Sequence, residues 1–333
     1  MIFSLSASET LNLREATELS TNITLPVNPI PQSLEAKPTS LTSYILGFTE
    51  GSEAKNKLVL TPNAYKVGKL YSAVPNDGTG DFTVDRNSTA TYIGQDGLIE
   101  TALANVPRID WGTGEAALLV EPQSTNFFLA SDPLVDPNIA EVDNVSFDAN
   151  DWGIGLTGKV IFSDNLVNTR RYRVSQALSE DITYTLSGLV KPYNGVKPSF
   201  IIFGGIGFLT IGGVALSNVN VRFTQWEGIY YVEGSGKINP SYPTLNGFRK
   251  DNTNNSIGFE LSSIQLEQAS TATSYIPTNG TTVTRLEDNI SVPTPAGVTS
   301  ITETIDGVEQ APITTIPTTY SLPVGNINKV TML

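Results

Sequence analysis

The sequence contains no cysteine and no histidine, and only 16 % of its 333 residues are charged. Without cysteine, the chain has neither a disulfide framework nor thiolate chemistry. Without histidine, it lacks the Ser-His-Asp and Cys-His catalytic arrangements and nearly all zinc and iron sites. An enzyme made from this chain would have to use carboxylates, lysine, tyrosine or a hard metal ion. No motif formed by these residue types points to catalysis or to a bound group, so we predict no enzymatic activity, no cofactor and no metal ligand.

Positive charge and long hydrophobic runs are also scarce. The net charge is −13, with 20 basic and 33 acidic residues, and the only basic cluster is Arg170, Arg171 and Arg173. This balance argues against nucleic-acid binding, because neutralising phosphates requires clustered lysine and arginine. The most apolar stretch, Phe200–Leu216, is interrupted by glycines, so no membrane span is expected. The segment "MIFSLSASETLNLREA" lacks the basic and apolar regions of a secretory signal peptide.

What is present is a strand pattern. Apolar residues make up 39 % of the chain, enough for a hydrophobic core. Segments such as "YTLSGLVKP" and "SIGFELSSIQLEQ" alternate apolar and polar residues between turns rich in glycine, asparagine and serine. Roughly eight such segments follow one another over residues 126–285, without a convincing helix longer than about two turns. We predict an all-β fold whose main body is an antiparallel jelly-roll sandwich over residues 126–285.

The residues before this sandwich fall into two parts. Residues 1–62 contain several prolines, which favour an extended chain, after a short helix over Ser8–Leu19. They form either a disordered tail or an N-terminal arm that orders against another subunit. The second interpretation is favoured by apolar residues every two or three positions, namely Ile23, Leu25, Val27 and Ile30. Residues 63–125 are predicted to be a β-rich connecting segment.

Residues 286–333 are predicted to be a small C-terminal β module. Asp306-Gly307 separates two extended segments, which is a strong signal for a β-hairpin. A module of this size is near the limit for independent stability. It should therefore pack on a neighbouring part of the protein or on a symmetry mate.

The stretch Ser72–Glu100 is rich in aspartate and glycine and permits two interpretations. Asp77 to Asp81 superficially resembles a calcium loop, but positions six and twelve, counted from Asp77, are Phe82 and Ser88. An EF-hand requires glycine and glutamate there, although another type of Ca²⁺ site stays open. The favoured interpretation is a rigid scaffold in which Arg86 pairs with a carboxylate on a neighbouring strand, for which Glu100 is the candidate.

Several motifs of this part of the chain resemble segments of bacteriophage virion proteins. They are Gly80-Asp81-Phe82, Arg86 with Ser88–Thr91, Gly97–Glu100, Asn105 with Pro107-Arg108, and Leu119–Asn126. In that family the segment precedes a jelly roll similar to carbohydrate-binding modules and lectins. The jelly roll often ends in a sequence similar to Ile264–Arg285, and "IDGVEQAPITTIPTTYSLPVGNINKVTM" resembles the C-terminal module of appendages from phages of gut Bacteroidales, including crAss-like phages.

The resemblance implies a structural protein on the capsid or tail surface of a virion, made in the bacterial host cytoplasm. The first expectation is a head-fibre or decoration protein, attached to other virion proteins through its N-terminal arm and forming a homo-oligomer, with a trimer favoured. The alternative is a tail-associated receptor-binding protein that recognises a host surface glycan. No catalytic residues come with the resemblance.

Two sets of residues are candidates for chemistry. A glycosidase needs two facing carboxylates, and the acids available are Asp148, Asp151, Glu227, Glu233, Glu260 and Glu267. None lies in a recognisable catalytic motif, so we interpret them as surface acids. Glycan binding uses aromatic faces together with amides and carboxylates. Trp152, flanked by Asn150 and Asp151, is the predicted contact of this kind.

Overall fold

The structure is a computed structural model that describes residues 56–61, 70–75, 77–131, 140–150, 152–156, 158–164, 169–175, 177–200, 208–211, 214–237, 245–250 and 257–333. Nearly all of the predicted arm, including the helix expected over Ser8–Leu19, lies outside these residues. Within them, every regular element is a β-strand and every strand pairing is antiparallel. The all-β antiparallel prediction is confirmed, while the jelly-roll connectivity stays a prediction. The described residues contain no helix long and apolar enough to cross a membrane.

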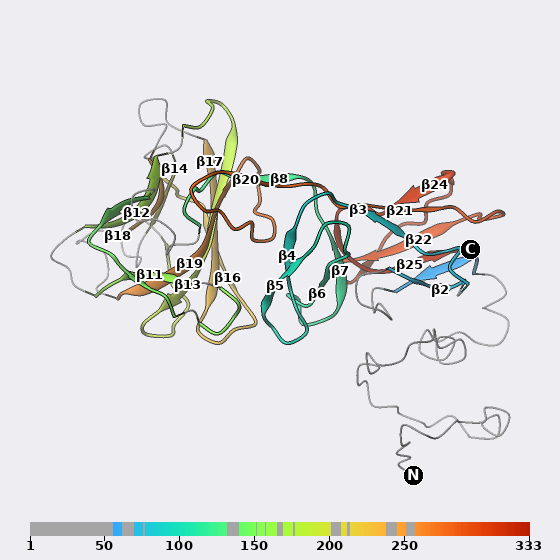
Figure 1. Cartoon of the computed structure of the whole chain (residues 1–333), viewed down its shortest axis with the longest axis horizontal. Helices are drawn as coiled ribbons and strands as arrows, with labels where there is room; N and C mark the ends of the chain where they lie inside the picture. Colours follow the sequence, from blue (N-terminus) through green and yellow to red (C-terminus); the bar gives the residue numbers. More distant parts are fainter. Residues whose placement is uncertain are drawn as a thin grey trace, which may run out of the picture. The chain divides into compact units, whose positions relative to one another are not determined.

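A two-sheet sandwich occupies the middle of the chain (Figure 1). Its first sheet contains β8 (Ser124–Asn126), β10 (Ser146–Asp148), β11 (Lys159–Phe162), β13 (Thr183–Pro192), β16 (Val219–Phe223), β17 (Tyr230–Lys237), β19 (Phe259–Glu267) and β20 (Val283–Arg285). Its second sheet contains β9 (Ala140–Asp143), β12 (Arg170–Ser175), β14 (Phe208–Ile211), β15 (Val214–Ala215) and β18 (Leu245–Lys250). The strand orders are β10-β11-β19-β13-β17-β16 and β15-β14-β18-β12-β9. Consecutive strands thus pass repeatedly from one sheet to the other.

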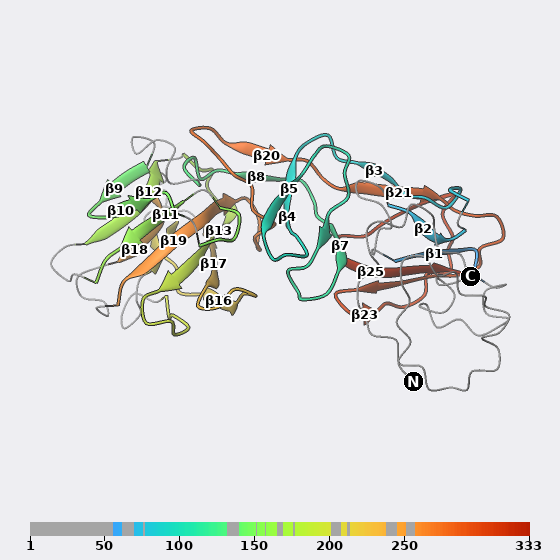
Figure 2. The ribbon, with the colours of Figure 1, turned by 60° about the horizontal axis from the view of Figure 1, so that its bottom comes forward.

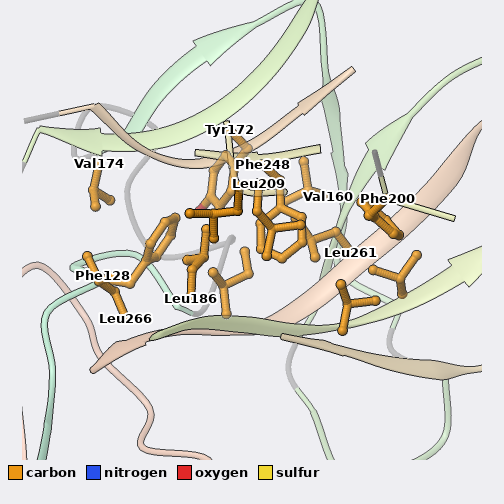
Figure 3. Packing of buried hydrophobic residues seen from close by; sticks show 14 of the residues in the cluster. Phe128, Val160, Tyr172, Val174, Leu186, Phe200, Leu209, Phe248, Leu261 and Leu266 are labelled. Atoms are coloured by element: carbon orange, nitrogen blue, oxygen red, sulfur yellow. The ribbon is translucent and has the colours of Figure 1, made fainter. Parts of the chain in front are cut away.

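The inner faces of these two sheets share one hydrophobic core. Tyr172 and Phe248 of the second sheet are buried in the same cluster as Leu186 and Leu261 of the first. Figure 3 shows their side chains filling the space between the strands. The alternation seen in the sequence therefore marks the inward faces, as expected for strands with one buried face.

A β-bulge explains where this alternation shifts. The pairing of β13 with β19 changes register between Ser187 and Leu189, and Ser263 on β19 has a φ of 54°. An extra residue in one strand reverses the faces of the residues beyond it. Leu261 and Ile264 consequently both point into the core although three positions separate them.

A second body combines strands from both ends of the described chain. Its seven-stranded sheet contains β1 (Leu58–Leu60), β2 (Ser72–Val74), β6 (Ile109–Asp110), β7 (Ala117–Val120), β22 (Ile301–Ile305), β23 (Val308–Glu309) and β25 (Gly325–Met332). A three-stranded sheet contains β3 (Thr83–Asp85), β21 (Asn289–Pro293) and β24 (Thr319–Ser321). Both sheets contribute to one core, for example through Leu118, Val330 and Ile290. A separate hairpin is formed by β4 (Ala90–Ile93) and β5 (Ile99–Ala102).

The strand pairing differs from the predicted domain division. Val59, assigned to the arm, pairs with Thr331 in the same sheet as β22, so residues 286–333 do not form a sheet of their own. They share both sheets with strands from residues 58–120. The sandwich is inserted between these parts, and its first and last strands, β8 and β20, pair with each other (Figure 2). The predicted hairpin at Asp306-Gly307 is confirmed, because Ile305 pairs with Val308.

Candidate functional site

A buried charge network lies where the motifs that carry the phage resemblance meet. We use this name for Arg86, Arg108, Glu121, Arg285 and Asp288, whose side chains are buried or nearly so. Arg86 Nη1 lies 2.7 Å from Asp288 Oδ1, and Arg108 Nη1 lies 2.8 Å from Glu121 Oε2. Arg108 Nη2 donates to the other oxygen of Asp288, which also accepts the backbone N–H of Glu121. Asp288 is therefore the centre of the network.

The partner predicted for Arg86 was wrong. Glu100 instead accepts the hydroxyl of Tyr92, which lies directly opposite it on the β4–β5 hairpin. Arg86 binds Asp288, 202 positions away, and its remaining N–H groups donate to the carbonyl groups of Ser88, Leu103 and Val106. The interpretation of this stretch as a scaffold fits these contacts, because one guanidinium links three separate segments of the chain.

Burial and charge act against each other in this network. Burial lowers the pKa of Arg86 and of Arg285. Burial also tends to raise the pKa of Glu121, but Arg285, Arg108 and two hydrogen bonds from Ser274 outweigh this effect and hold the pKa below its ordinary value. The Glu121 carboxylate is thus kept ionised by the guanidinium groups beside it. This arrangement fits a structural role, in which the ion pairs hold together segments that are distant in the sequence.

Two of the three predicted glycan-contact residues, Asn150 and Trp152, lie on the outer side of the first sheet. Trp152 is half-buried, and its indole N–H donates to Glu260 Oε2 at 2.5 Å. Lys159 Nζ lies 3.4 Å from Glu260 and 3.5 Å from Asp148. Asn150 is exposed and donates to Asp148 through its side-chain amide. The third predicted residue, Asp151, lies outside the described residues.

These contacts define the Trp152 patch, made of Asp148, Asn150, Trp152, Lys159 and Glu260. The indole also packs against a small third hydrophobic cluster that contains Ile154, Leu189 and Ile229. An aromatic ring set among an amide, two carboxylates and an ammonium is a surface that sugar hydroxyls can hydrogen-bond. Trp152 therefore has both a packing role and a partly exposed face.

The other candidate carboxylates have structural partners. Glu233 lies 3.5 Å from Arg222, and Glu227 is exposed. Glu267 is fully buried and accepts hydrogen bonds from Ser124, Thr273 and Gln265. Burial raises the pKa of Glu267 despite these donors. The interpretation as a surface acid is therefore wrong for Glu267, whose carboxylate is buried among its hydrogen-bond donors. The absence of catalysis stays a prediction.

The aspartates of the suspected calcium loop accept hydrogen bonds from nearby groups of the chain. Asp77 Oδ1 accepts the N–H and the hydroxyl of Thr79, and Asp81 Oδ1 accepts the N–H of Ser72. Among the described residues, no cluster of three or more acidic side chains is arranged to hold a metal ion.

A groove of about 340 Å³ lies beside the β4–β5 hairpin, along β16 and β17. Tyr92 on the hairpin and Arg222, Trp226 and Tyr231 on the sandwich line it. Its remaining lining residues include Thr91, Asp110, Glu121, Thr224, Gln225, Ser263, Ser274, Tyr275 and Asn326.

The groove was not predicted from the sequence. The residues that line it come from segments far apart in the chain, and no local motif joins them. The environment of Trp226 depends on Gly97, 129 positions away, whose carbonyl accepts the indole N–H. Phe223 on β16 is 74 % exposed, although it follows the apolar alternation of Val219 and Val221. It lies at the end of an edge strand beyond which the first sheet does not continue among the described residues.

Comparison with protein-family models and with curated protein sequences gives no match. The function must therefore be argued from the residues and their geometry.

Proposed function

We propose that this chain is a non-enzymatic structural component of a bacteriophage virion, specifically a head-fibre or decoration protein. The observation that carries the proposal is the buried charge network. Arg86, Arg108 and Glu121 belong to the motifs that resemble phage virion proteins, and their side chains hold the scaffold together. Motif residues whose side chains pair with one another inside the protein support a structural role.

The strand pairing supports the same proposal. The part of the chain that precedes the sandwich and the part that follows it share two sheets, so the sandwich is inserted into a body closed by both ends of the described chain. The paired strands β8 and β20 connect the two. An inserted domain carried on a closed base suits a protein that projects a module from a particle surface. Attachment through the N-terminal arm and assembly as a homotrimer are parts of this proposal.

The test is particle composition. Particles of the phage that encodes this sequence are purified by density gradient, and their proteins are quantified by mass spectrometry. The proposal expects peptides of this chain at a fixed ratio to the major capsid or tail protein. Its presence only in the unassembled lysate fraction would refute the proposal.

A second candidate function, glycan recognition by a tail-associated protein, is favoured by the Trp152 patch. Half-exposed Trp152 lies among groups able to bind hydroxyls, with Glu260 fixing its indole N–H. Binding to a glycan array that is lost in Trp152→Ala, but kept in the exposed control variant Val308→Ala, would support this function. Val308 is a suitable control because it is 60 % exposed and lies on β23, outside the sandwich. If no glycan on the array binds, glycan recognition is refuted and only the head-fibre proposal stands.

A further inference from the structure

We infer that the groove beside the β4–β5 hairpin is a binding site for an uncharged oligosaccharide. This inference rests on the second candidate function, glycan recognition, but assigns the ligand to different residues from the Trp152 patch. It is carried by three properties of the groove: fixed walls, a mixed aromatic and polar lining, and charges that are already paired.

The walls of the groove are fixed by hydrogen bonds between distant segments. The indole N–H of Trp226 donates to Gly97 O at 2.8 Å, and Ile99 N donates to Ile154 O at 2.8 Å. The hydroxyl of Thr91 donates to the carbonyl of Tyr275. The hairpin is thereby held against the sandwich at both its turn and its base. A preformed groove loses little conformational entropy when a ligand binds.

The lining combines ring faces with uncharged hydrogen-bonding groups. Tyr92 and Trp226 provide aromatic surface, and Gln225 is an exposed amide at the groove. The volume of about 340 Å³ is within the usual range for ligand sites. Rings that contact C–H surfaces, next to amides and hydroxyls that bind O–H groups, match the two-sided chemistry of a sugar ring.

The charges at the groove are compensated by the protein itself. Glu121 is paired with Arg108 and Arg285, and Arg222 lies 3.5 Å from Glu233 with its guanidinium over the ring of Tyr231. The chain also carries a net charge of −13, which disfavours anionic ligands at long range. The remaining carboxylate, Asp110, accepts the N–H groups of Ile93 and Gly112. The groove thus favours an uncharged ligand over an acidic one.

The experiment measures binding of the full chain to two sets of oligosaccharides of equal length. One set is uncharged (gluco-, manno- and galacto-oligosaccharides) and the other is acidic (uronate and sulfated oligosaccharides). Gln225→Ala and Phe223→Ala change exposed side chains at the groove, and Val308→Ala, 60 % exposed on β23, is the matched control. We expect an uncharged oligosaccharide to bind with a Kd that changes little between 0.05 and 0.5 M NaCl, as an uncharged ligand should. Gln225→Ala should weaken this binding about threefold to tenfold, the effect of one lost neutral hydrogen bond.

The outcomes separate this inference from the function on which it rests. Uncharged-glycan binding that is lost in Trp152→Ala but unchanged in both groove variants would overturn the inference while glycan recognition stands. Binding restricted to acidic oligosaccharides would overturn the proposed ligand class. No binding to any oligosaccharide would overturn both glycan recognition and this inference. Thermal unfolding of each variant confirms that a loss of binding is not a loss of fold.

Discussion

Replacing Asp288 by asparagine removes the central negative charge of the buried charge network while keeping the shape of the side chain. Asp288 is 6 % exposed as a residue and its carboxylate binds Arg86 on one oxygen and Arg108 on the other. Without this charge, the three guanidiniums of the network face Glu121 as their only carboxylate partner within it. Breaking a buried ion pair from one side costs about 3–5 kcal/mol, because the remaining charge stays buried without compensation.

We therefore expect Asp288→Asn to lower the free energy of unfolding by about 3–5 kcal/mol. The assay is urea unfolding at pH 7, followed by fluorescence of Trp111, Trp152 and Trp226, the three tryptophans of the chain. The matched control is Asp181→Asn, because the carboxylate of Asp181 is 98 % exposed and lies 3.8 Å from Lys237. This control should leave the urea midpoint unchanged. A loss below about 1 kcal/mol in Asp288→Asn, the range of an exposed pair, would refute the reasoning.

Two further predictions concern acid stability and backbone geometry. Because the pKa of Glu121 is held below its ordinary value of 4.5 in the folded protein, its ionised form contributes stability above that pH, and this contribution is lost as the pH falls through the folded pKa. Urea unfolding between pH 6 and pH 3 should show a steeper loss of stability in the native chain than in Glu121→Gln, and parallel curves would contradict the prediction. A Cβ at Gly155 would lie 2.5 Å from the carbonyl oxygen of Ile99, whereas Gly153 has a similar positive φ and open space around it. Gly153→Ala should lower the free energy of unfolding by about 1 kcal/mol, because its backbone is strained. Gly155→Ala should lower it further and accelerate amide exchange at Ile99. Equal losses of stability in the two variants would show that the close contact with Ile99 is unimportant.

The local parts of the fold could be predicted from the sequence. Asp306-Gly307 gives a hairpin because both residues adopt positive φ values, 51° and 77°, in a two-residue turn. Phe259 and Leu261 point into the core because strand alternation depends only on neighbouring residues. Even the three-residue step from Leu261 to Ile264 is visible in the sequence, although its cause, the bulge at Ser263, is visible only in the strand pairing.

The long-range parts could not be predicted. β1 pairs with β25, which places Val59 opposite Thr331. The sequence of a short apolar strand does not specify which other strand it pairs with, so this pairing could not be predicted. Arg86 was assigned a nearby carboxylate, yet Glu100 is occupied by Tyr92 and the true partner is Asp288. The ion-pair partner of a buried arginine is set by the tertiary fold, so it can be a carboxylate far away in the sequence. The groove was missed for the same reason, since its walls come from the hairpin and from the sandwich.

Imaging of phage particles that carry this chain with a label in the turn Asn194-Gly195 tests the central claim most directly. Asn194 is exposed in the turn that follows β13 of the sandwich, so a label there should be accessible outside the particle. The account predicts label density at regular positions on the capsid or tail surface. Particles that are complete and infectious but carry no label anywhere would contradict it.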